Sequence, residues 1–246
     1  MADIVMKTVS SEELMKMSFP NIEFCIEDLI PKGLTVLTGP LWSGKSCLAL
    51  DLCWRVAGNT PIWDLEVTPG DAHYIFMDDT MDRVVNRAKR INEGMPKEGR
   101  KICYTKGEGH TMDQILEWLP RTLAQNPGTK FVVLDLAETL VYQPDQLWTN
   151  LYGFEVYRKL KLYAKQFDIA IMAVQRCENR ALKQTGWQQP INGYSMVDNV
   201  LHLDWRSRCN RTATLTGSGT LLGYREWELE FSPEKLRWEL HDSSQL

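Results

Sequence analysis

The chain has 246 residues, of which 43% are hydrophobic, and a formal net charge of −4 at pH 7. These values predict an ordinary globular protein with a substantial core, and they argue against a broadly basic protein that coats nucleic acid. Scattered cysteines, no apolar run of about 18 residues and no signal-like N-terminus predict a cytoplasmic protein without a membrane span.

The start of the chain is interpreted as a polar lead over residues 1–20, with a short helix at Ser11–Met17, followed by one domain over 21–246. Ile22–Ile26 alternates weakly, as an edge strand does, and a turn at Leu29–Gly33 leads into the next strand. We expect this segment to form a lid or entry strand over the site that the next residues build.

A phosphate-binding motif follows the apolar and β-branched run Leu34–Thr38. Residues 39–46 read G-P-L-W-S-G-K-S, which matches G-x-x-x-x-G-K-[ST] at every fixed position, and a helix-forming run without Gly or Pro comes next. This order predicts ATP binding, with Lys45 on the β and γ phosphates and the Ser46 hydroxyl on Mg²⁺. The nucleotide-binding residues predicted here are Gly39, Pro40, Leu41, Trp42, Ser43, Gly44, Lys45, Ser46 and Cys47.

Further along the chain, apolar runs of strand length alternate with helical segments. This alternation predicts an α/β fold with a mostly parallel sheet flanked by helices. The expected strands are 72–77, 101–105, 131–135 and 169–175, and the expected helices are 81–93, 151–167 and one that begins at Thr111. Four shorter runs then predict a C-terminal antiparallel meander at 200–203, 212–216, 227–231 and 236–240, with turns at Gly217–Gly219, Gly223 and Ser232–Pro233.

Carboxylates end two of the expected strands. Asp135 follows four apolar residues at the carboxyl edge of the sheet, so Ser46 and Asp135 are the predicted metal-binding residues. The alternative is that Asp135 merely ends a strand. Asp78 and Asp79 end another strand, and since neighbouring residues on an extended chain point to opposite sides, we expect at most one of them to face the phosphate. We favour Asp78 as the base that activates water, and helix capping by both acids is the alternative.

Gln175 ends the strand after Asp135 and is predicted to hydrogen-bond the γ-phosphate, so the predicted catalytic residues are Asp78, Gln175 and Lys45.

Two basic segments complete the candidate site. Residues 176–192 are rich in Arg, Lys and Gln and contain Trp187, which makes this segment a candidate contact for single-stranded DNA, with solvated loop charge as the alternative. A second cluster, Arg206, Arg208 and Arg211, offers candidates for an arginine finger or forms a plain surface cluster.

The order of these features resembles the RecA-like ATPases, and within them the RepA-type replicative helicases and related AAA-family ATPases of bacterial mobile elements and prophages. The resemblance runs from Ile22 to Leu240 and is carried by the phosphate loop and its approach, by W-D-L-E-V-T-P-G-D-A-H-Y-I-F-M-D-D-T-M-D-R, by F-V-V-L-D and by I-A-I-M-A-V-Q-R. It implies a RecA-type core, ATP with Mg²⁺, a nucleotide held between subunits of a homo-oligomer, and action on DNA.

The chain departs from these relatives at three positions. Asp78 stands where they usually carry Glu, Gln175 where RepA-type proteins tend to carry His, and Gly217–Gly219 where a Gly-Arg-Asp is frequent. We therefore expect an ATPase that turns over slowly and acts in replication or maintenance of a mobile element. The alternatives are a nucleotide-binding switch or scaffold with little hydrolysis, and a small-molecule kinase, against which the C-terminal meander argues.

Overall fold

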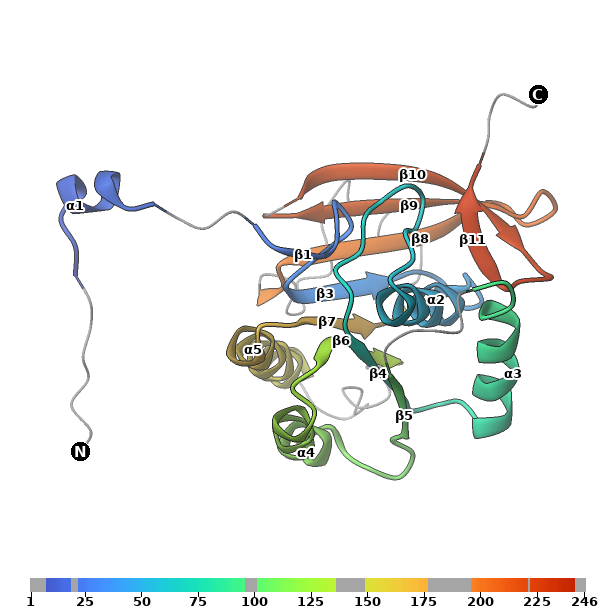
Figure 1. Ribbon diagram of the computed structural model, residues 1–246, viewed down its shortest axis with the longest axis horizontal. Helices are drawn as coiled ribbons and strands as arrows, with labels where there is room; N and C mark the ends of the chain where they lie inside the picture. Colours follow the sequence, from blue (N-terminus) through green and yellow to red (C-terminus); the bar gives the residue numbers. More distant parts are fainter. Residues whose placement is uncertain are drawn as a thin grey trace.

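The computed structural model describes residues 8–18, 22–95, 101–135, 149–176, 196–220 and 222–241 (Figure 1). Its helices are α1 (Ser11–Lys16), α2 (Lys45–Gly58), α3 (Met81–Ile91), α4 (Met112–Gln125) and α5 (Thr149–Phe167). Its strands are β1 (Phe24–Ile26), β2 (Ile30–Pro31), β3 (Gly33–Thr38), β4 (Asp71–Phe76), β5 (Ile102–Lys106), β6 (Thr129–Asp135), β7 (Ala170–Val174), β8 (Asn199–Ser207), β9 (Thr212–Gly219), β10 (Gly223–Ser232) and β11 (Arg237–Leu240). The expected helices and strands are present, with ends shifted by a few residues. Within these residues, no helix is long and apolar enough to cross a membrane.

Nine of the described strands form one sheet in the order β11-β10-β9-β8-β3-β7-β6-β4-β5. The strands from β8 to β5 pair in parallel, and β8, β9, β10 and β11 pair antiparallel. The prediction of a mostly parallel α/β fold with a C-terminal meander is therefore confirmed. Strand β8 joins the two parts, because it lies parallel to β3 on one side and antiparallel to β9 on the other.

The core fills both faces of the parallel strands. Along β6, Phe131 and Val133 pack on the face covered by α2 and α3, whereas Val132 and Leu134 pack on the face covered by α4 and α5. This alternation follows from the two-residue period of a strand, and it explains why β6 and β7 are apolar at nearly every position. Helix α2 contacts β4 and β6, which fixes the phosphate loop at its start relative to the strand ends.

Two sequence predictions were wrong. Strands β1 and β2 form a separate antiparallel pair at the amino end of β3, where Lys32 donates to Glu23 and Asp168, so they do not cover the carboxyl edge as a lid. Gly217–Gly219 is the end of β9 and not a turn. A Cβ at Gly217 would lie 3.1 Å from the Trp227 ring, so the glycine accommodates a close cross-strand neighbour.

Candidate functional site

The carboxyl ends of the parallel strands surround a cavity of about 310 Å³ at one edge of the sheet. It is lined by the phosphate loop and the start of α2 on one side and by the residues between β4 and α3 on the other. The lining residues are Leu41, Trp42, Ser43, Gly44, Lys45, Ser46, Cys47, Asp78, Asp79, Arg83, Arg87, Asp135 and Arg176. The sequence predictions for the loop, Asp78 and Asp135 therefore meet in one place.

The phosphate loop is shaped by two glycines. A Cβ at Gly39 would lie 2.3 Å from the Leu203 carbonyl oxygen, and Gly44 has φ +80°, a left-handed conformation that strains other residues. Lys45 is 6% exposed, and its Nζ donates to the carbonyl oxygens of Gly39 at 2.8 Å and Pro40 at 2.7 Å. The motif's cation is thus held inside the curve of the loop, where an anion would be bound.

Asp135 is fully enclosed beside the start of α2. Its Oδ2 accepts a hydrogen bond from the Tyr74 hydroxyl, while Oδ1 is buried without a hydrogen-bond partner among the described residues. Burial raises the pKa of the Asp135 carboxyl, and Tyr74, Ser46, Arg87 and Lys45 oppose that rise. A buried carboxylate oxygen next to the Ser46 hydroxyl is a hard oxygen donor of the kind that Mg²⁺ prefers, so these residues fit the ion.

The two aspartates after β4 have different surroundings. Asp79 pairs with Arg87 at 2.7 Å and with Arg83 at 3.3 Å, and it also accepts from the Thr80 amide at 3.0 Å. Asp78 is exposed at the cavity. The residue that caps α3 is Thr80, whose hydroxyl accepts from the Arg83 amide, so the alternative that both acids cap the helix is wrong.

The structure brings Gln175 only to the rim. Its amide donates to the Leu37 carbonyl at 2.8 Å, which places it at the carboxyl edge, but the neighbouring Arg176 lines the cavity instead. Gly39 and Pro40 contribute carbonyls to Lys45 and are not lining residues. The candidate DNA segment lies outside the described residues beyond Arg176.

The meander arginines lie beyond the same edge. Arg206 ends in an ion pair with Glu228 of β10, and Arg208 and Arg211 flank the turn between β8 and β9. Strand β8 runs parallel to β3 past the phosphate loop, so this turn projects beyond the cavity. The arginine-finger interpretation of this cluster stays a prediction.

The family of the chain follows from its similarity to known proteins. A family model described as an AAA domain matches residues 4–174. The chain belongs to this AAA domain family. No curated protein matches it. Among solved structures, the chain is similar to the "ATPase Domain of G40P" (TM-score 0.64, 14% identity, 94% of this chain and 96% of that chain covered). It is also similar to one described as "The Structure Of A DnaB-Like Replicative Helicase And Its Interactions With Primase" (TM-score 0.65, 13% identity, 94% and 66% covered). The fold of this AAA domain is therefore the RecA-like fold of replicative helicase domains.

Two site residues of this AAA domain escape sequence reasoning. Tyr74 lies within an apolar strand and looks like core, although its hydroxyl holds Asp135. Arg87 looks like one charge on an amphipathic helix, yet its Nη1 is buried without a hydrogen-bond partner among the described residues and it lines the cavity. The spacing of nine residues between Asp78 and Arg87 gives no such signal, because only the packing of α3 turns Arg87 toward the cavity.

Replacing Tyr74 with Phe is expected to raise the Mg²⁺ concentration that half-saturates ATP binding by about 10–100-fold, as for other residues that orient metal ligands. Burial raises the pKa of Tyr74 well above its ordinary value, so the hydroxyl keeps its proton and donates to Asp135. The measurement is anisotropy of a fluorescent ATP analogue against Mg²⁺. Tyr104→Phe is the matched control, since that neighbouring ring packs edge-on against Tyr74 at 6.3 Å. Equal Mg²⁺ dependence in both variants would contradict the role of Tyr74.

Proposed function

We propose that this AAA domain binds Mg·ATP and hydrolyses it in the cytoplasm, as a subunit of a homo-oligomer that acts in replication or maintenance of a mobile element or prophage. The observation that carries the nucleotide part is the meeting of Lys45, Ser46 and Asp135 at one cavity, in the arrangement that the motif requires. Lys45 supplies positive charge to the phosphates, and the start of α2 supplies backbone amides and the positive end of its dipole.

Magnesium would be held by Ser46 and Asp135. The unpartnered Asp135 Oδ1 supports this assignment, because a buried carboxylate oxygen without a donor is costly unless a ligand satisfies it. When bound, the ion neutralises phosphate charge and so assists the attack on the γ-phosphorus. Among the described residues there is no cluster of three or more His, Cys, Asp or Glu that could hold a metal by itself, which suits an ion that keeps water and phosphate ligands.

Hydrolysis is assigned to Asp78 as the base. It is the carboxylate at the cavity that is exposed, whereas Asp79 is engaged by Arg83 and Arg87. The predicted contact of Gln175 with the γ-phosphate remains part of this proposal, and Arg176 is a second candidate because it lines the cavity. The short side chain of Asp78 is the reason to expect slow turnover.

Oligomer formation and DNA binding are supported by the neighbours. The solved structures include an ATPase domain and a replicative helicase by their descriptions. In this chain, Arg208 and Arg211 lie on a turn beyond the cavity edge, where one of them could reach the nucleotide of an adjacent subunit. Residues 176–192 supply the basic and aromatic side chains proposed to contact single-stranded DNA.

A second function is a nucleotide-dependent switch with little hydrolysis. The observation that favours it is the Asp79 pairing with two arginines, which leaves hydrolysis to a single short acid. In this case ATP would change the shape or assembly of the protein, and the γ-phosphate would be retained.

Phosphate release with and without an oligothymidine strand tests the proposal. We expect release that depends on Mg²⁺ and increases with the strand, because DNA binding between subunits would complete the site. ATP binding without release above that of Lys45→Ala would reject the ATPase and favour the switch. Sedimentation in the same buffer with ATP checks assembly, and a monomer at every concentration would argue against a site shared between subunits.

A further inference from the structure

Two tryptophans of the C-terminal strands hold the outer side of the phosphate loop. Trp205 of β8 donates from Nε1 to the Trp42 carbonyl at 3.0 Å, and Trp238 of β11 donates to the Gly44 carbonyl at 3.4 Å. The two indoles pack on each other with ring centroids 5.0 Å apart. A Cβ on Gly44 would come 2.8 Å from the Trp238 ring nitrogen, so the indole lies directly against the loop backbone.

Trp238 is itself fixed in place. It is 1% exposed, its ring packs on Phe231, and its backbone carbonyl accepts from Trp63 Nε1 at 2.8 Å. Side chains locked by packing and by further hydrogen bonds are those that can hold a neighbouring site in one geometry.

The preceding residue of β11 contacts the end of α3, the helix whose Arg83 and Arg87 line the opposite wall of the cavity. Arg237 is buried and donates to the carbonyl oxygens of Ile91 and Glu93, the latter at 3.0 Å, at the end of α3. It also lies 3.8 Å from Asp51, a fully buried carboxylate on α2. One arginine therefore joins β11, α2 and α3.

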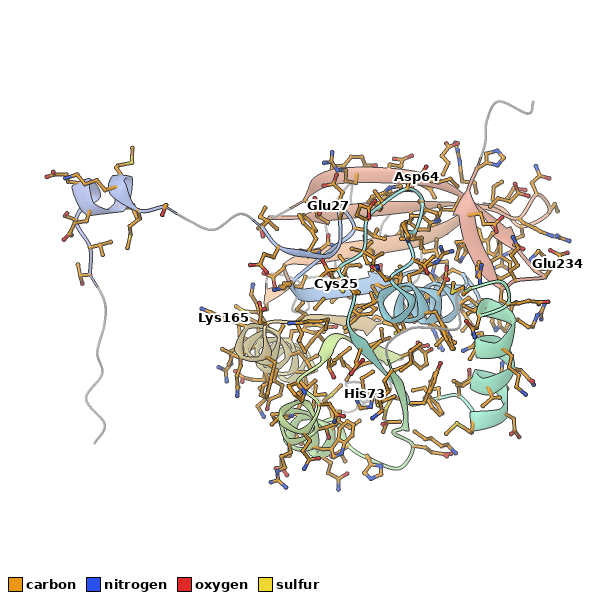
Figure 2. All side chains as sticks on the ribbon, in the orientation of Figure 1. Cys25, Glu27, Asp64, His73, Lys165 and Glu234 are labelled. Carbon is orange, nitrogen blue, oxygen red and sulfur yellow. The ribbon has the colours of Figure 1, made fainter. Side chains whose placement is uncertain are left out.

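The turn before β11 adds to this connection. Arg90 of α3 donates to the carbonyl oxygens of Pro233, and of Glu234 at 3.1 Å. Figure 1 shows β11 beside the end of α3, and Figure 2 labels Glu234 at this turn. Helix α3 carries Arg83 and Arg87 on the cavity, so both walls of the cavity are attached to the same hairpin.

We propose that β11 sets the geometry of the nucleotide cavity, with Trp238 as a positioning residue for the phosphate loop and Arg237 as a positioning residue for α3. This inference rests on the proposed function in so far as the cavity takes Mg·ATP. It assigns the antiparallel end of the sheet, which supplies no lining residue among those described, a direct part in nucleotide binding.

Trp238→Phe tests the first half. This change keeps an aromatic ring and removes the indole donor, so we expect binding of a fluorescent ATP analogue with Mg²⁺ to weaken about fivefold, the effect of one lost hydrogen bond. Trp227→Phe is the matched control, because Trp227 belongs to the same aromatic region but packs on Trp63 and Gly217. Its affinity is expected to stay within about twofold of the parent.

A second readout needs no nucleotide. In the ligand-free protein, hydrogen exchange of the peptide over residues 39–46 is expected to be faster in Trp238→Phe than in Trp227→Phe, although both keep the parent's circular dichroism. If Trp238→Phe fails to fold, Trp205→Phe replaces it, since that change removes the bond to Trp42. Unchanged exchange and affinity overturn the inference. Faster exchange in a protein that binds no ATP would instead overturn the proposed function alone.

Arg237→Lys tests the second half. Lysine keeps a charge near Asp51 and loses the guanidinium Nη2 that donates to the Ile91 and Glu93 carbonyls, so we expect kcat to fall while KM stays near the parent value. Trp238→Phe should give the opposite split, with KM raised more than kcat is lowered. The same loss in both parameters for both variants would indicate general destabilisation and overturn the assignment.

Discussion

Replacing Lys45 with Ala is expected to weaken Mg·ATP binding by about 10–100-fold, because a charge-assisted hydrogen bond to phosphate contributes about 1.5–3 kcal/mol. The structure gives the reason for the size of the effect. Lys45 is buried and already oriented by the Gly39 and Pro40 carbonyls, so little side-chain entropy is lost when phosphate oxygens replace them. Isothermal calorimetry with ATP and Mg²⁺ measures the change.

Lys32→Ala is the control for lost positive charge. Lys32 precedes β3 at its other end, where it pairs with Glu23 and Asp168. We expect this variant to bind ATP as the parent does, although it loses ion pairs at the far edge of the sheet. Equal ATP affinity of Lys45→Ala and the parent, with both proteins folded by circular dichroism, would reject the cavity as the nucleotide site.

The sequence predicts the parts of this site whose chemistry is local. The phosphate loop is one continuous motif, and Asp135 ends an apolar run, so both could be assigned without knowing the fold. Their meeting follows from a general property of parallel sheets, in which strand ends of one polarity share an edge. The structure distinguishes the two aspartates, because Asp79 accepts a hydrogen bond from Arg87, a residue of the helix that follows.

Tyr74 shows what a single sequence leaves out. Its hydroxyl meets Asp135 because β4 pairs with β6 in a register that sets Phe76 opposite Asp135, which places Tyr74 on the same face. Parallel pairing joins strands distant in the sequence, and periodicity within each strand does not encode that register. The tryptophan contacts to the loop could not be predicted from the sequence either, because β11 and the loop are about 200 residues apart in the chain.

Replacing Asp78 with Ala is expected to lower kcat for ATP hydrolysis by about 10²–10⁴-fold, the usual contribution of a general base, and to leave ATP affinity nearly unchanged. Asp78 reaches the cavity without an ion pair to the α3 arginines, so its removal should not disturb the Asp79 pairing. Single-turnover phosphate release at saturating ATP measures the chemical step separately from binding.

Two further variants, Asp78→Glu and Asp79→Asn, test which of the two acids is the base. If the shorter acid slows the reaction, Asp78→Glu adds the missing methylene and should hydrolyse ATP faster than the parent. Asp79→Asn removes the charge that orients the Arg83 and Arg87 side chains, which line the cavity, so it should raise KM while α3 itself stays in place. Hydrolysis by Asp78→Ala at the parent's rate would show that the base lies elsewhere, and loss of kcat in Asp79→Asn alone would then assign the role to Asp79.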